Sequence, residues 1–381
     1  MKEIALIGFA QTLFFSLLIV TKKKKEIKDY LIIIFLLFVG AELFYRYLLQ
    51  VIPESEIKWM TLFDITYWAL FGPTILMYIY FTINKVKKVN YLHLLHLIPL
   101  FISLFSIKNY YFGNSEYISF IDYFNRSTGI TNVALLFWEF CTPLYIVYSL
   151  YVLIMHKKSL KEYFSNISKK TLKWLFLLLS YFAIFLLMSY IVMLMRVIFH
   201  VEVNFNSLGI LPTILTAYVF FIGYYGYKQA GIFFDYPEKK NNILNKQFKI
   251  ADNKYSKSGL SEIERDELTI KLKKVMETEK PYIEDNLNIN MLAKMLNTSI
   301  NKLSQVINET FDQNFYSFIN THRIEESKQL LKDPENEKYT IISIAYDCGF
   351  NSKSSFYNAF KQNTGITPKK YLEQQNIINM Q

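Results

Sequence analysis

Long runs of apolar residues fill residues 4 to 228 and then stop, so the chain has two unlike parts. A helix needs about 20 largely apolar residues to cross the hydrocarbon core of a membrane, and seven segments approach or exceed that length. Globular cores seldom contain so many long apolar helices, so the pattern predicts a membrane bundle of seven helices. The predicted spans are Ile4–Val20, Tyr30–Gln50, Trp59–Ile83, Tyr91–Ile107, Thr131–Met155, Leu172–Phe199 and Leu208–Tyr227.

A polar stretch, Asp235–Gly259, separates the apolar part from the remainder of the chain. It is rich in lysine and asparagine and shows no sustained periodicity, which predicts a tether over residues 231–260. Its roughly 25 residues would reach about 80–90 Å when extended and about 25–30 Å as a coil. Ser261 and Glu264 then form a capping box that begins a helix, and Pro281 ends that helix. The apolar stripe of this helix comprises Leu268, Leu272, Val275 and Met276.

Residues 292 to 332 predict a first helix-turn-helix motif and a longer helix that follows it. Ser299 is placed to cap the second helix of the motif, and the longer helix spans Phe315–Lys332. The outward face of the capped helix carries groups that can bond to base edges or to phosphates. We predict DNA contacts from Asn301, Lys302, Ser304 and Gln305. The inward positions are Leu292, Ala293, Leu296, Leu303, Val306 and Ile307.

The stretch from Tyr339 to Glu373 predicts a second helix-turn-helix motif. Its first helix ends at Gly349, where a residue with left-handed backbone geometry is wanted. Ser352 can cap the next helix, Lys353–Asn363, whose inner face is aromatic. We predict DNA contacts from the outward side chains of this helix, which are Lys353, Ser354, Tyr357, Asn358 and Lys361.

The second motif reads IA…GF…SxFxxxFK…GxTPxxY, and this order resembles the AraC/XylS transcription regulators. LAxxL…S…LSxV…F…R…L resembles the first half of the same domain, so the likeness covers about Leu260 to Gln375. In that family the long helix joins two motifs whose recognition helices enter successive major grooves, which implies double-stranded DNA as a partner. Asp312 departs from the family's turn glycine, and Gln305 stands where arginine is common. The whole layout is similar to bacterial proteins in which a seven-span membrane domain precedes an AraC-type domain.

The charge is divided unevenly between the two parts. The chain is 52% hydrophobic with a mean hydropathy of +0.16 and a net charge of +10. The first 259 residues hold 27 Lys and Arg against 15 Asp and Glu, whereas the rest holds 15 against 17. The basicity therefore belongs to membrane-facing loops and anionic lipid, and does not itself indicate DNA binding. Within the tail, Lys338 to Lys370 carries five lysines against one acid, so we expect the phosphate contacts mainly there.

Lysines cluster in alternate loops of the apolar part, and this fixes the predicted orientation. The rich loops follow the first, third and fifth spans, around Lys22–Lys28, Lys85–Lys88 and Lys157–Lys173. The positive-inside rule places these loops in the cytoplasm. We therefore predict a multi-pass protein of the bacterial cytoplasmic membrane, with its N-terminus outside and its C-terminus inside.

Five ionisable residues fall within the predicted spans, all at about 6–13 Å from the outer end of their helix. Charges at that depth need partners or a wet cavity. Two interpretations stay open: a structural network of ion pairs, or a polar site that binds a ligand from outside or from the lipid phase. The residues are Glu42, Arg46, Asp64, Glu139 and Arg196.

Taken together, the sequence predicts an all-α protein in three parts: a seven-helix membrane sensor (1–230), a cytoplasmic tether (231–260) and a soluble dual helix-turn-helix domain (261–381). It contains no motif for catalysis, metal binding or a cofactor, and we expect a transcription regulator that is not an enzyme. Because the tether is long, we expect the signal to act through the geometry of a homodimer. Two other functions stay open. One is a membrane enzyme or transporter with an autoregulatory tail, and the other is a receptor whose tail docks a protein.

Overall fold

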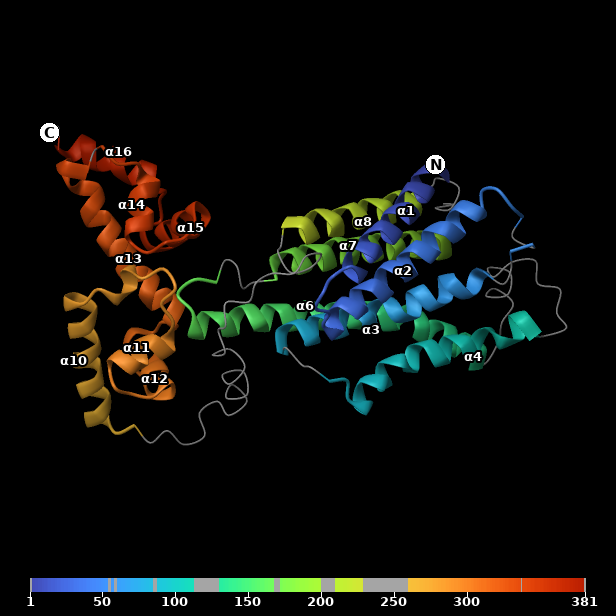
Figure 1. Ribbon diagram of the computed structural model, residues 1–381, viewed down its shortest axis with the longest axis horizontal. Coiled ribbons are helices and arrows are strands. Elements are labelled where there is room, and N and C mark those ends of the chain that lie inside the picture. Colours follow the sequence, from blue (N-terminus) through green and yellow to red (C-terminus); the bar gives the residue numbers. More distant parts are fainter. Residues whose placement is uncertain are drawn as a thin grey trace. The chain divides into compact units, whose positions relative to one another are not determined.

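The chain folds as an all-helical protein in the computed structural model shown in Figure 1. The structure describes residues 2–53, 56–57, 60–84, 88–112, 130–167, 172–199, 210–228, 260–336 and 338–379. These residues contain fourteen α-helices and no strand, only one isolated bridge between Phe164 and Asn288. The chain divides into two compact units. The first comprises 1–153 and 172–252, and the second comprises 154–171 and 253–381. The predicted tether, 231–260, lies outside the described residues except for Leu260.

The helices of the apolar part overlie the seven predicted spans. They are α1 (Lys2–Val20), α2 (Ile27–Leu48), α3 (Thr61–Asn84), α4 (Ile98–Phe112), α6 (Ile130–Tyr163), α7 (Lys173–Phe199) and α8 (Ile210–Lys228). Among the described residues, three helices are long and apolar enough to cross a membrane by length and composition alone. These are Lys2–Val20, Ile27–Leu48 and Phe140–Tyr163. A bundle of seven membrane spans therefore stays a prediction.

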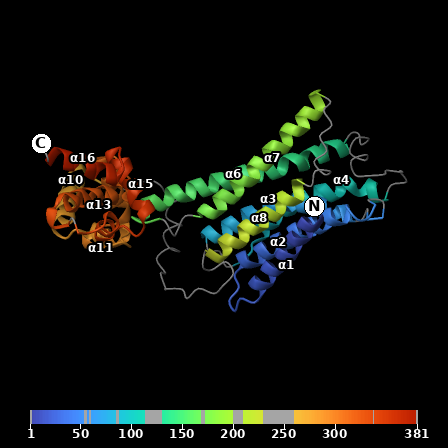
Figure 2. The same ribbon diagram turned by 90° about the horizontal axis from the view of Figure 1, so that it is seen from above.

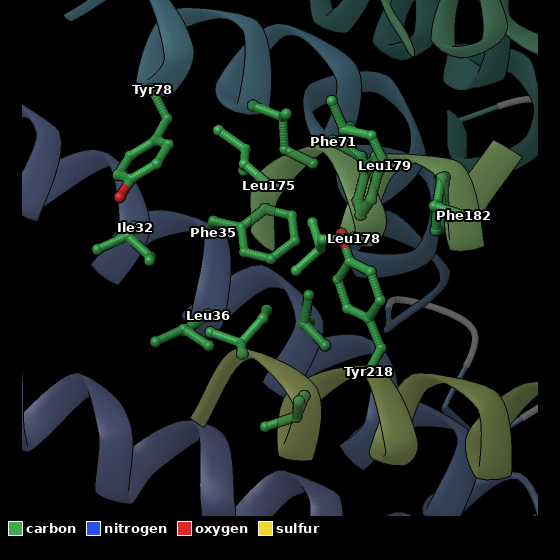
Figure 3. Close-up of a cluster of buried hydrophobic side chains, with 14 of the residues drawn as sticks. Ile32, Phe35, Leu36, Phe71, Tyr78, Leu175, Leu178, Leu179, Phe182 and Tyr218 are labelled. Atoms are coloured by element: carbon green, nitrogen blue, oxygen red, sulfur yellow. The ribbon is translucent and has the colours of Figure 1, made fainter. Parts of the chain in front are cut away.

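The first unit is held together by an aromatic and aliphatic core that α2, α3, α7 and α8 share (Figure 3). Phe71 of α3 stacks on Phe182 of α7 with ring centroids 3.8 Å apart, and Phe35 of α2 lies 5.2 Å from Phe71. Tyr218 of α8 completes the group, 5.9 Å from Phe182. In Figures 1 and 2, α1 lies beside α2 and α8, in agreement with their contacts.

The fourth predicted span is two elements instead of one helix. Residues Tyr91–Leu97 form a 3-10 helix (η2), and α4 begins only at Ile98. Pro99 explains the change, because proline has no N–H and is therefore favoured in the first turn of an α-helix. The two histidines of η2 have separate partners. His93 Nδ1 accepts a bond from the Asn90 amide at 2.8 Å, and His96 Nδ1 lies 2.9 Å from the hydroxyl of Tyr145.

The second unit contains the two predicted motifs, joined by one long helix (Figure 1). Its helices are α10 (Glu262–Thr278), α11 (Ile289–Met295), α12 (Ile300–Phe311), α13 (Phe315–Lys332), α14 (Ile341–Asp347), α15 (Lys353–Thr364) and α16 (Pro368–Asn379). The last ten residues of α6 also belong to this unit. One apolar core lies under α10 to α13 and a second lies under α13 to α16. The predicted bounds of α13 and the predicted start of α15 are confirmed.

Candidate nucleic-acid interface

The first motif consists of α11 and α12, and a short polar side chain caps each helix. The Asn288 side chain accepts a bond from the amide of Met291, and Ser299 Oγ accepts one from the amide of Lys302 at 3.3 Å. Asn297 takes a left-handed conformation (φ 51°) in the turn between the helices. Asp312 does the same (φ 51°) at the end of α12, as expected where it replaces a glycine. All six predicted inward positions are buried, so α12 presents its other face to solvent.

Two of the four predicted contact residues on the outward face of α12 are bonded to acidic side chains. Lys302 Nζ lies 3.2 Å from a carboxylate oxygen of Glu264, and Gln305 Nε2 donates to Glu309 at 2.9 Å. Ser304 Oγ accepts a bond from the side chain of Asn308 at 3.4 Å, and Asn301 is exposed. A lysine beside a carboxylate attracts a phosphate less strongly than one that stands alone. These contacts leave the first motif with hydrogen-bonding groups but little positive charge.

The second motif consists of α14 and α15. Thr340 Oγ1 caps α14 at the amide of Ser343 (3.1 Å), and Ser352 Oγ caps α15 at the amide of Ser355 (3.2 Å). Gly349 has φ 87° in the turn, as its position predicts. Phe356 and Phe360 of α15 are fully buried, with ring centroids 5.5 Å apart. Because these rings fix the inward face of α15, the opposite face is free to meet a partner.

That opposite face of α15 is cationic and accessible. Lys353, Ser354, Asn358 and Lys361 are exposed, whereas Tyr357 is half-buried against the second core. The ammonium of Lys353 lies 5.5 Å from the ring centroid of Tyr357, a contact that orients the lysine side chain. The nine predicted DNA-contact residues therefore lie on two helices with different electrostatic character. Whether they contact DNA stays a prediction.

A buried arginine joins the two motifs, and the pattern of apolar residues gave no sign of it. Arg323 of α13 is only 1% exposed. Its Nε donates to the carbonyl oxygen of Tyr282 at 2.6 Å, and its Nη2 donates to that of Glu284 at 2.8 Å. Its guanidinium carbon also lies 5.7 Å from the ring centroid of Phe350, just after the turn of the second motif. The Arg323 side chain thus contacts both the backbone that precedes α11 and the ring of Phe350, which precedes α15.

We call this arginine and its partners, Tyr282, Glu284 and Phe350, the joint. Burial lowers the pKa of Arg323 to about 10, so the side chain stays charged near neutral pH. Its hydrogen bonds to uncharged carbonyl oxygens offset the cost of burying that charge. Beside the joint, Glu326 accepts bonds from Lys280 Nζ (2.7 Å) and from the Tyr282 hydroxyl (3.0 Å). The joint therefore fixes how the two motifs are oriented relative to each other.

The predicted sensor residues are only partly described. Glu42 is fully buried in α2, and its carboxylate lies 2.6 Å from Nε of Arg46, one turn along the same helix. The structure thus brings these two residues together as an intrahelical ion pair. Asp64 lies in α3, Glu139 in α6 and Arg196 in α7, but their side chains lie outside the described set. Within the described residues, no group of three or more His, Cys, Asp or Glu could hold a metal ion.

Comparisons with known proteins agree with this reading of the second unit. Residues 292–374 match the family described as helix-turn-helix domain. A 90-residue stretch is 34% identical to an uncharacterized HTH-type transcriptional regulator of Staphylococcus aureus strain COL, and equally to one of strain MSSA476. That stretch is 24% of this chain but only 12% of each relative. No solved structure shows a significant match. The similarity therefore supports a DNA-binding regulator through the C-terminal domain alone.

Proposed function

We propose that this protein is a transcription regulator that is embedded in the bacterial cytoplasmic membrane and binds DNA through residues 261–381. In this proposal residues 1–230 form the membrane sensor, and residues 231–260 form the tether between the two. The N-terminus is outside and the C-terminus is in the cytoplasm. The regulator works without a catalytic residue or a cofactor.

The observation that carries the DNA-binding part is the pair of capped helices, α12 and α15, within a matched helix-turn-helix domain. Both helices bury their apolar face and expose polar side chains of the types that bond to bases and phosphates. The helix between them, α13, has 18 residues and so spans about 27 Å. With the widths of the flanking helices added, this length suits the roughly 34 Å repeat of the duplex.

The membrane part rests on the apolar surface of the first unit. Leu17 of α1 is 63% exposed and Leu144 of α6 is 69% exposed, and many other large apolar side chains lie on this surface. So much exposed apolar area is unfavourable in water but favourable against lipid tails. The lysine distribution supports the orientation, because the lysines before α2 and those in the last turns of α6 favour the cytoplasmic side.

The sensing part rests on the ionisable residues of the spans. Glu42 is buried and forms an ion pair with the partly buried Arg46 in α2. Charged groups in a membrane helix cost about 2.5–3.5 kcal/mol each unless they are paired or reached by water. We propose that this pair, together with Asp64, Glu139 and Arg196, responds to a ligand from outside or from the lipid phase. A homodimer would then carry the response to DNA.

Chromatin pull-down with the full-length chain in its native host tests the proposal most directly. The expected result is enrichment of a small set of promoters that share one motif. The purified chain in lipid nanodiscs should then bind that DNA with an affinity that falls as salt rises. Absence of any salt-dependent DNA binding would favour a protein-docking tail. Transport or turnover of a substrate by the purified chain would favour a membrane transporter or enzyme.

A further inference from the structure

The segment Tyr163–Ile167 begins at the last residue of α6 and is bound by the helix-turn-helix unit. Tyr163 packs against the core beneath α10 to α13. Phe164 forms an isolated antiparallel bridge with Asn288, the residue that caps α11. Phe164 and Ile167 are both buried. Just before the segment, the ammonium of Lys161 lies 5.6 Å from the ring centroid of Tyr316, at the start of α13. We call Tyr163–Ile167 the docked segment.

Ser165 is the polar centre of the docked segment. It is 2% exposed, and its amide and hydroxyl both donate to the carbonyl oxygen of Leu287, at 3.3 Å and 2.6 Å. Its hydroxyl oxygen also accepts a bond from Arg323 Nη2 at 3.2 Å. The buried hydroxyl of Ser165 thus donates one hydrogen bond and accepts another, each with a defined partner. These bonds favour one position of the docked segment, because a shift would leave a buried polar group unpaired.

The partner of Ser165 is the arginine at the centre of the joint. The same Nη2 that binds Ser165 also binds the Glu284 carbonyl, while the guanidinium faces the Phe350 ring. A displacement of Ser165 therefore acts directly on the contact that orients the two motifs. A segment bound to an exposed surface of α10 or α16 would not act on the joint in this way.

The docked segment is also the direct continuation of a predicted membrane span. Only seven residues separate Met155, the end of the predicted span, from Tyr163, and all of them are helical. The helix rises about 12 Å from Met155 to Tyr163. A helix transmits rotation and translation over such a distance, whereas a tether of about 25 residues does not.

We propose that the docked segment is an intramolecular ligand of the joint, and that movement of α6 reorients the two helix-turn-helix motifs through the Ser165–Arg323 contact. This inference rests on the proposed function, since it supplies the route from membrane to DNA. It replaces the expectation that coupling runs only through the tether and the geometry of a dimer. When docked, the segment preorganises the joint and so favours DNA binding.

The docking itself is tested by crosslinking the full-length chain in native membranes, without DNA. A Lys161→Cys, Tyr316→Cys variant also carries a protease site inserted between residues 235 and 259. After treatment with a short bis-maleimide reagent and cleavage, the two fragments should stay joined. The native Cys141 and Cys348 are buried, so each single-cysteine variant is the control for background reaction. A mixture of the two single-cysteine variants detects linkage between chains. If the two fragments of the double-cysteine variant separate as they do in the single-cysteine controls, the segment is not docked and the proposal is wrong.

The coupling is tested by displacing the segment without touching Arg323. Ser165→Tyr should abolish the crosslink because no space exists at this buried site, whereas Ser159→Tyr on the half-buried side of α6 should preserve it. In nanodiscs, the affinity of Ser165→Tyr for the pulled-down promoter should fall about fivefold or more relative to Ser159→Tyr. An unchanged or increased affinity with the crosslink lost would overturn the proposal. A wild-type chain that binds no DNA but still crosslinks would instead refute the proposed function and leave the docking intact.

Discussion

The backbone of Gly349 lies against the carbonyl oxygen of Tyr282, so that a Cβ added to Gly349 would lie 2.5 Å from that oxygen. The turn of the second motif thus touches the 3-10 helix Pro281–Ile283, which precedes the first motif. Together with Arg323, this contact makes the joint a close-packed surface in which neither partner can shift alone.

Gly349→Ala should destabilise the joint, and Gly365 offers a matched control. Both glycines have positive φ, 87° and 79°, but a Cβ on Gly365 would meet nothing within 4 Å. We expect about 1 kcal/mol for Gly365→Ala, from backbone strain alone, and roughly 3 kcal/mol or more for Gly349→Ala. Hydrogen exchange of α13 and α14 in the full-length chain measures the difference. Equal costs at the two positions would contradict the close contact with Tyr282.

Lys361→Ala should weaken DNA binding more than Lys302→Ala. Lys361 is exposed on α15, whereas Lys302 of α12 already lies 3.2 Å from the carboxylate of Glu264. Losing one phosphate contact should flatten the slope of log affinity against log salt by about one unit for Lys361→Ala, and by less for Lys302→Ala. Titrations of the pulled-down promoter at several salt concentrations give both slopes. A larger loss for Lys302 would show that the first motif dominates the phosphate contacts.

Asn358→Ala should change base preference instead of general affinity. An asparagine amide can bond to adenine in the major groove but carries no charge to attract phosphates. We expect the preference for one base to relax at one position of the site, with the salt slope unchanged. Selection of binding sites from a randomised DNA pool by wild-type and variant chains provides the comparison. A uniform loss across all sequences would place Asn358 on the DNA backbone or outside the interface.

Acidification should destabilise the second unit through His322. This imidazole stacks on Tyr282 (5.6 Å) and meets the edge of Phe318 (4.8 Å), and burial lowers its pKa below the usual value near 6.5. Below about pH 6.5 the unfolded chain binds a proton that the folded chain resists, so stability present at higher pH is lost as pH falls. Pulse proteolysis in urea between about pH 7.5 and pH 5.5 should show this fall. His322→Gln should reduce it, and an unchanged pH dependence would assign it to other groups.

Glu42→Gln tests whether the buried pair in α2 takes part in sensing. The amide oxygen of glutamine can still accept a bond from Arg46 Nε, so shape and contact are kept while the charge is lost. We expect an altered response of a reporter driven by the native promoter, with normal membrane abundance, and the same for Glu139→Gln. Loss of the protein from the membrane in step with loss of response would make these charges structural. Normal signalling in both variants would place the ligand site elsewhere.

Local rules were sufficient to predict much of the second unit. The caps at Ser261, Ser299 and Ser352 and the left-handed residue at Gly349 are each specified within a few positions of the sequence, and each is confirmed. The family match at residues 292–374 confirms the helix-turn-helix assignment. Such features follow from hydrogen-bonding demands at helix ends, which depend only on near neighbours.

Contacts between distant residues escaped prediction. Arg323 has the appearance of a surface residue on an amphipathic helix, and its burial depends on backbone 41 residues earlier in the chain. Its bond to Ser165 links positions 158 residues apart. Lys22 was predicted as one of several loop lysines, yet it is buried in a 2.8 Å ion pair with Asp29. Nothing in a periodic pattern distinguishes a lysine or arginine that will find a buried partner from one that stays in water.

The joint around Arg323 sets one orientation of the two motifs when the docked segment is in place, and this orientation also limits how a promoter for this protein can change over time. Each base pair turns the duplex by about 35°, so inserting or deleting one pair between two half-sites rotates one of them away from its recognition helix. Base substitutions within a half-site cost only the contacts of that base. In the operators of such a regulator, the bases of each half-site should therefore vary more than the spacing between the half-sites. A search of related genomes should weight the spacing above the identity of individual bases.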